Sequence, residues 1–356
     1  MFVYIALAVV IGIFALQEDG ERTSQVTTRF YISLFLFLLV VGLRYMHGDY
    51  RSYLMGYNTG IDVGGDPGYY ELQLFFSRQG VSFQFFVFIL TLVSVFALRQ
   101  TFRMNFWPNI GFTIILGKIF TLYAMSGIRQ YLAMVVCWWA ISELLIYKRK
   151  YVFLIMVLLA YTLHGSAIII LPVYFFRKRK FTFFTACIIM IIAIIGGSFS
   201  MSFFSQASGM NDFIDERFAG YVYESRIGGE AMNALNYVEN FLFLFLAIKI
   251  RNRIISKVPY YDFFLYMFVI YCGFLVAGSD VGIVKRLRDY YALSYIFIIP
   301  SFIYFFSRKS LRKLSQCMII SYFIFLMFRS LIVYDRPLSI GSYGRMIPYH
   351  SIFQIK

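Results

Sequence analysis

Residues 148–180 read KRKYVFLIMVLLAYTLHGSAIIILPVYFFRKRK, a largely apolar run between two basic clusters. If the run crossed a membrane once, the clusters would lie on opposite faces, whereas Lys and Arg favour the cytoplasmic side. Both clusters stay inside only if the chain turns back near His164-Gly165, which leaves legs of 13 and 11 residues (151–163 and 166–176). Each leg would reach about 17–20 Å as a helix. His164 is therefore predicted at the floor of a cavity that opens outward.

The composition of the whole chain is that of a protein whose solvent is lipid. Of its 356 residues, 60% are hydrophobic and 14% are charged, against about 45–50% and about 25% in soluble domains. A soluble enzyme, a disordered region and a secreted disulfide scaffold are excluded. The four cysteines lie within apolar runs without metal-ligand spacing, so we expect no disulfide framework and no metal site. We also expect no cofactor.

Apolar segments of helical length predict an all-α integral membrane protein with about 10–12 transmembrane helices. Residues 1–16 lack a basic leader and a cleavage site, so they are expected to remain as the first helix. No Pro-, Gly- or Ser-rich linker divides the chain, and residues 1–356 are predicted to form a single polytopic membrane domain. The segments are 1–16, 29–46, 81–98, 109–125, 128–147, 151–163, 166–176, 181–201, 236–250, 260–278, 290–306 and 315–333.

The connections between these segments differ in charge. One set holds 19 Lys or Arg and three acidic residues, and the alternate set holds 12 of each. The positive-inside rule assigns the first set to the cytoplasm. The net charge of +15 therefore indicates topology and not nucleic-acid binding, and the expected partner is the lipid bilayer. The external loops are 46–80 and 202–235; the second has the aromatic and acidic residues of a sugar-binding loop, although a solvated loop fits equally well.

Arginines gather at the outer face, where the positive-inside rule should deplete them. Arg44 precedes the first external loop, Arg129 joins two spans, and Arg286 and Arg288 precede the eleventh. A guanidinium binds two phosphate oxygens at once, so the four arginines together suit a lipid-linked pyrophosphate. Each one alone could instead be an interfacial anchor.

Transfer of a sugar to a hydroxyl also calls for a base and for groups that bind the acceptor. His164 and Asp49 are the candidate bases, since imidazole and carboxylate can both take a hydroxyl proton. His164 is favoured for its predicted depth. The candidates for glycan binding are Tyr50, Glu71 and Tyr290. Lone acidic residues on an outer face are more often simply solvated.

The order of these motifs resembles the EpsG-like family of bacterial membrane proteins, which is grouped with the Wzy-type O-antigen and exopolysaccharide polymerases. The resemblance covers most of the chain, but not the tail or residues 202–235. It is carried by Gly42-Leu43-Arg44, Gly48-Asp49-Tyr50, Tyr53, Pro67-Gly68-Tyr69, Ser126-Gly127-Ile128-Arg129-Gln130, His164-Gly165-Ser166-Ala167 and Arg288-Asp289-Tyr290-Tyr291.

The resemblance implies a polymerase in the bacterial cytoplasmic (inner) membrane, with a glycosyltransferase C-type fold and an active site that faces the periplasm. The donor would be a glycan on undecaprenyl pyrophosphate and the acceptor a new lipid-linked repeat unit, without a nucleotide sugar. A chain-length regulator protein is a further conceivable partner. The residues to which the family roles transfer are Arg44, Asp49, Arg129, His164 and Arg288.

Two other functions remain open from the residues alone. A transporter or flippase of lipid-linked sugars would also need an outward cationic pocket. It should show inverted repeats or paired broken helices, and this chain shows one broken hairpin, at 151–176. An O-antigen ligase shares the donor chemistry and transfers the glycan to a lipid A core. Only the family motifs favour the polymerase over the ligase.

Overall fold

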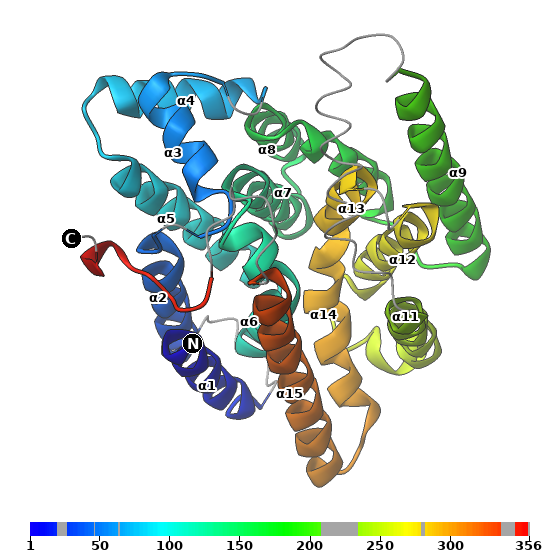
Figure 1. The fold of residues 1–356 in the computed structure, drawn as a ribbon. Coiled ribbons are helices and arrows are strands. Elements are labelled where there is room, and N and C mark those ends of the chain that lie inside the picture. Colours follow the sequence, from blue (N-terminus) through cyan, green and yellow to red (C-terminus); the bar gives the residue numbers. More distant parts are fainter. Residues whose placement is uncertain are drawn as a thin grey trace. The chain divides into compact units, whose positions relative to one another are not determined.

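The computed structural model describes residues 1–19, 27–45, 47–62, 65–207, 234–278, 282–335 and 346–354. These residues form helices joined by shorter connections, without a named strand among them, so the prediction of an all-helical protein is confirmed (Figure 1). Each of the twelve predicted apolar segments is helical over most of its described residues. The chain divides into two compact units, one made of Met1–Leu171 with Phe306–Lys356 and the other of Pro172–Phe305.

The helices of the first unit begin where the sequence supplies capping residues. The side-chain oxygens of Thr27 and Ser82 accept from backbone N–H groups three residues on, and Pro67 and Pro108 stand in the first turn, where proline costs no hydrogen bond. The helices are α1 (Phe2–Leu16), α2 (Thr28–Gly42), α3 (Tyr50–Thr59), α4 (Pro67–Arg78), α5 (Phe83–Phe102), α6 (Pro108–Ile115), α7 (Ile128–Ile146), α8 (Lys150–Leu163) and α15 (Lys309–Tyr334).

The predicted external loop 46–80 holds two short helices, α3 and α4, beside α5 and α8 (Figure 1). On α3 the buried face is formed by Tyr50, Tyr53 and Tyr57, which are spaced so that they lie on one side of a helix. Tyrosine is amphipathic, so this face does not register as an apolar run in the sequence. The helices α3 and α4 therefore pack as part of the first unit and are not a simple connection.

The chain turns back at His164, as the sequence predicted. His164 ends α8 with an extended backbone, and a 3₁₀ helix (Gly165–Phe176) follows. His164 lies level with the first turn of α7, since one carboxylate contacts both His164 and Arg129. Three residues later the Ala167 carbonyl lies 3.9 Å from Sγ of Cys137, which is about 12 Å further along α7. The segment after His164 therefore runs back along the hairpin of α7 and α8.

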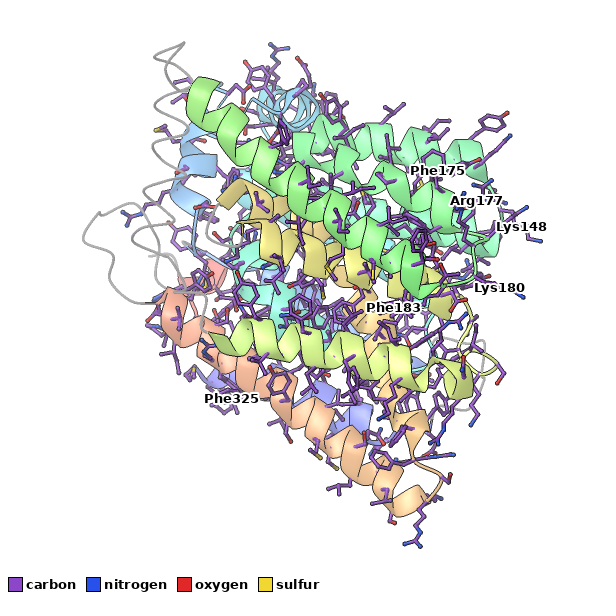
Figure 2. All side chains as sticks on the ribbon, turned by 90° about the vertical axis from the view of Figure 1, so that its right-hand side faces the viewer. Lys148, Phe175, Arg177, Lys180, Phe183 and Phe325 are labelled. Carbon is purple, nitrogen blue, oxygen red and sulfur yellow. The ribbon has the colours of Figure 1, made fainter. Side chains whose placement is uncertain are left out.

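Within the described residues, two helices, α5 and α15, are long and apolar enough to cross a membrane, and several shorter helices are also apolar. Large apolar side chains project from their outer faces. On α15, Phe325 is 61% exposed and points away from the first unit (Figure 2). In the second unit, Phe183 is likewise exposed. Such surfaces are costly in water and suited to lipid.

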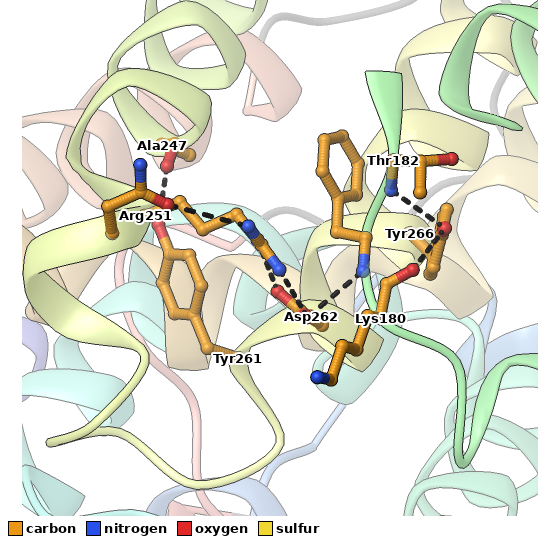
Figure 3. A network of polar contacts seen from close by, with 9 residues as sticks. Lys180, Thr182, Ala247, Arg251, Tyr261, Asp262 and Tyr266 are labelled. Atoms are coloured by element: carbon orange, nitrogen blue, oxygen red, sulfur yellow. Dashed lines mark hydrogen bonds and ion pairs between the residues drawn. The ribbon is translucent and has the colours of Figure 1, made fainter. Parts of the chain in front are cut away.

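The second unit consists of the described parts of α9 (Phe183–Ala207), α11 (Ala234–Ile254), α12 (Tyr261–Gly278), α13 (Gly282–Asp289) and α14 (Leu293–Ser301). A polar network ties the start of α9 to α11 and α12 (Figure 3). The Asp262 carboxylate accepts two hydrogen bonds from Arg251, at 2.6 and 2.7 Å, and one from the Phe181 N–H at 2.9 Å. The Tyr266 hydroxyl donates to the carbonyl of Lys180. This network fixes the basic segment before α9.

Glu18 provides a direct test of the first unit's packing. Its carboxylate accepts hydrogen bonds from the N–H groups of Asn109 (2.7 Å) and Ile110 (3.1 Å) at the start of α6. Glu18→Ala leaves these donors without an acceptor, so we expect the free energy of unfolding to fall by about 1–3 kcal/mol. Thermal unfolding in detergent measures the loss. Asp19→Ala is the control, since Asp19 is exposed and faces only Lys313; equal losses in the two variants would contradict this role.

Candidate functional site

Two glycines bring the first turns of α3 and α4 against α7 and α8. Gly48 has a φ of +53°, and a Cβ there would lie 2.3 Å from Oγ of Ser126. At Gly68 a Cβ would lie 2.4 Å from Oγ1 of Thr162 and 2.9 Å from its carbonyl oxygen. Any larger residue would push the helices apart. Both glycines are therefore needed for the site that follows.

Asp66 is the buried centre of a polar cluster, the Asp66 cluster, which consists of Asp66 and the half-buried Arg129 and His164. Its Oδ2 accepts from Nη1 of Arg129 at 2.9 Å and lies 3.0 Å from Nδ1 of His164. Its Oδ1 accepts from the N–H of Gly165 at 3.2 Å. Burial alone would raise the pKa of the Asp66 carboxyl, but the contacts with His164, Arg129 and Gly165 outweigh burial and lower the pKa. Asp66 is therefore ionised in the folded protein at neutral pH.

Two arginines lie near the same tyrosines. The guanidinium of Arg129 lies over the rings of Tyr53, at 5.3 Å, and Tyr69, at 5.7 Å, and these two are also among the tyrosines whose electrostatic interaction acts on the pKa of Arg44. Arg44 is 1% exposed and donates to the Val41 carbonyl. It takes part in none of the ion pairs formed among the described residues. Burial lowers the pKa of Arg44 to about 10, so the group still carries its charge at neutral pH.

Asp49, the second candidate base, lies next to the start of α7. Oδ2 of Asp49 accepts a hydrogen bond from Oγ of Ser126 at 3.1 Å, and the backbone N–H of Asp49 donates to this Ser126 oxygen at 3.3 Å. The N-termini of three helices, α3, α4 and α7, thus lie close together, and the positive ends of their dipoles favour an anion there. Of the residues predicted from sequence, the first unit holds six, and four of them are the candidate cations and bases Arg44, Asp49, Arg129 and His164.

The other two predicted arginines belong to the second unit. Arg286 and Arg288 lie on α13, and Nε of Arg288 donates to Oδ1 of Asp289 at 2.9 Å. The guanidinium of Arg288 also lies 5.0 Å from the centre of the Tyr271 ring. Arg288 is thus buried and paired within its own unit. Its joining with Arg44 and Arg129 at one pyrophosphate stays a prediction.

The residues predicted to bind glycan differ in exposure. Glu71 is exposed on α4, whereas Tyr50 is buried and donates from its hydroxyl to Gln84 at 2.9 Å. Tyr290 is fully buried in the second unit. Most of the predicted sugar-binding loop 202–235, residues 208–233, lies outside the described residues. Glu71 is therefore the one of the three whose side chain is open to an incoming sugar.

Sequence reasoning missed Asp66 as a site residue. It read this aspartate only as part of the external loop 46–80, where no helix was expected. The signal that could have singled it out is the following Gly68, which marks a close approach of the chain to another segment. The partners, Arg129 and His164, are 63 and 98 positions away, which no local pattern reveals.

Comparison with known proteins gives one match. A family model described as the EpsG family matches residues 28–351. This range includes all three residues of the Asp66 cluster as well as Arg44 and Asp49. The search of curated proteins found no match, and neither did the search of solved structures.

Proposed function

Because the chain belongs to the EpsG family, we propose that it is a membrane polysaccharide polymerase, a glycosyltransferase that joins undecaprenyl-pyrophosphate-linked repeat units into O-antigen or exopolysaccharide. The observation that carries this proposal is the Asp66 cluster beside the buried Arg44. This arrangement puts two guanidinium groups and an imidazole together in one unit. The proposed reaction needs cations to stabilise the leaving pyrophosphate and a base to take the proton of the acceptor hydroxyl.

The donor side of the proposal rests on Arg129 and Arg44. As the bond between the sugar and the pyrophosphate breaks, negative charge grows on the departing phosphate, and cations fixed in advance stabilise it. Within the described residues, Nε of Arg129 and the hydroxyl of Tyr69 are buried without a hydrogen-bond partner. A phosphate oxygen is the kind of acceptor that both donors lack. Arg286 and Arg288 are proposed to contribute from the second unit.

The acceptor side rests on His164. Nε2 of His164 would take the proton of the acceptor hydroxyl as that oxygen bonds to the anomeric carbon of the donor glycan. The bond from this carbon to the pyrophosphate oxygen breaks, and undecaprenyl pyrophosphate leaves with the bonding electrons. Asp49 is the alternative base. Tyr50, Glu71 and Tyr290 are proposed to bind the glycan, and the exposed Glu71 is the first to test.

The membrane location and its orientation are part of the proposal. The two long apolar helices and the exposed apolar side chains of α15 support a lipid environment. The proposed site is the bacterial cytoplasmic membrane, with the Asp66 cluster on the outward side. The loop that joins α7 and α8, which contains Lys148 (Figure 2), would then face the cytoplasm.

Cysteine labelling tests this orientation. In a variant without the exposed Cys187 and Cys317, we expect a cysteine at Glu71 to react with a membrane-impermeant maleimide added to intact cells. A cysteine at Ser310, at the start of α15, should react only after the membrane is opened, because basic segments stay in the cytoplasm. Both positions are exposed in the first unit. The reverse pattern would overturn the outward placement of the site.

Reconstitution tests the function itself. Purified protein in liposomes is supplied with a lipid-pyrophosphate-linked repeat unit alone, and the products are separated by size. A polymerase gives a ladder of glycans that differ by one repeat. A transporter would move the lipid across the bilayer without a ladder, and a ligase would need a lipid A core acceptor; either result would contradict the proposal.

A further inference from the structure

The arrangement around Asp66 suggests a role that goes one step beyond the bases and cations named above. We infer that Asp66 is a positioning residue, which holds the proton of His164 on Nδ1 and so leaves Nε2 bare to accept the proton of the incoming sugar hydroxyl. This inference rests on the proposed function and names a further residue for the same reaction.

The contact between Asp66 and His164 fixes which nitrogen carries the proton. An ionised carboxylate can only accept hydrogen bonds, so the 3.0 Å contact between Oδ2 and Nδ1 requires a proton on Nδ1. A neutral imidazole has one N–H and one lone pair. The lone pair is then on Nε2, for which the described residues supply no hydrogen-bond partner. His164 keeps 16% of its side chain exposed, which leaves room for an approaching hydroxyl.

Asp66 itself has little freedom to turn. Its two oxygens are held from different sides, Oδ2 by Arg129 and Oδ1 by the N–H of Gly165. Its backbone is held by the close packing of Gly68 on Thr162. The side chain is 9% exposed, so bulk water does not replace these partners. The carboxylate therefore sets the orientation of the imidazole ring and not only its proton.

The shared oxygen also links the two halves of the reaction. Oδ2 accepts from Arg129, the proposed pyrophosphate ligand, and from His164, the proposed base. A single carboxylate thus keeps the cation for the donor and the base for the acceptor at a fixed separation. Loss of Asp66 should affect the base most, because Arg129 keeps its stacking on Tyr53 and Tyr69.

The test reads the proton on His164 without any substrate. The chain has three histidines, so ¹⁵N-histidine labelling gives few imidazole signals, and the His164→Gln variant assigns the one of His164. In the wild-type protein we expect the Nδ1–H form. In Asp66→Ala the signal should move to the Nε2–H form, which an unconstrained imidazole prefers. Asp66→Asn should fall between them, because an amide oxygen can still accept from Nδ1. An unchanged Nδ1–H form in a folded Asp66→Ala variant would overturn the inference.

Kinetics separate positioning from mere structural support. If Asp66 acts through His164, kcat should fall by up to about 10²–10⁴-fold in Asp66→Ala, the contribution of a positioned base, with a smaller change in KM for the donor. The fall should follow the loss of the Nδ1–H form across the variants. A fall in kcat that follows only thermal stability would contradict the role. If the wild-type protein forms no polymer, the proposed function fails, whereas the imidazole signals still report on Asp66.

Discussion

Replacement of Arg129 by Ala is expected to abolish detectable polymer, with the rate lowered by about 10²–10³-fold. Arg129 is the cation that contacts Asp66, stacks on Tyr53 and Tyr69, and keeps a buried donor without a partner among the described residues. Arg129→Lys should restore part of the activity, since an ammonium carries the charge but cannot bind two oxygens in a fork. Polymer from reconstituted lipid-linked repeat units is the measurement.

The matched control for this prediction is Arg51→Ala. Arg51 is an exposed residue of α3 in the same unit, so its loss tests whether any outward arginine matters. We expect near wild-type polymer from this variant and normal membrane insertion of both. Full activity of Arg129→Ala would leave Arg129 as an interfacial anchor.

His164→Ala is the second variant with a large expected effect. A positioned general base contributes about 10²–10⁴-fold to a rate, so most turnover should be lost. Donor binding should persist, because Arg44 and Arg129 remain. Asp49→Asn should be milder, since the Asp49 carboxylate is already engaged with Ser126. Single-turnover rates and donor affinity, measured separately, distinguish the two effects.

Two outcomes would change the assignment of the base. A His164→Ala variant that polymerises at a near wild-type rate would transfer the role to Asp49, provided that Asp49→Asn is then inactive. If both variants stay active, stabilisation of the leaving group by arginines would be sufficient and the reaction would need no protein base. In either case, the role of Asp66 as a positioning residue would be contradicted together with the role of His164 as the base.

The sequence predicts the helices well because the signals that form them are local. The twelve apolar segments are helical over most of their described residues, and the break at His164 follows from two basic clusters that both favour the cytoplasmic side. Arg44, Asp49, Arg129 and His164 lie in one unit, and their placement at the outer face stays a prediction. Charge and hydrophobicity at each position were sufficient for these features.

Features that depend on distant contacts were not predictable in the same way. The helices α3 and α4 were expected to be a loop, because the large side chains on their buried faces are tyrosines and a glutamine rather than aliphatic residues. Asp66 was missed because its partners come from α7 and from the end of α8. The pairing of Arg288 with Asp289 was also missed, since an Arg-Asp pair in sequence does not reveal whether the two side chains meet.

The central claim is that the chain transfers a glycan from one lipid pyrophosphate to another repeat unit. Its most direct test is the amount of lipid pyrophosphate released for each new glycosidic bond in a reconstituted reaction. The account predicts one molecule of lipid pyrophosphate released for each new glycosidic bond. In Arg129→Ala it predicts neither lipid pyrophosphate nor new glycosidic bonds above background. New bonds without release of lipid pyrophosphate, or release without new bonds, would contradict it.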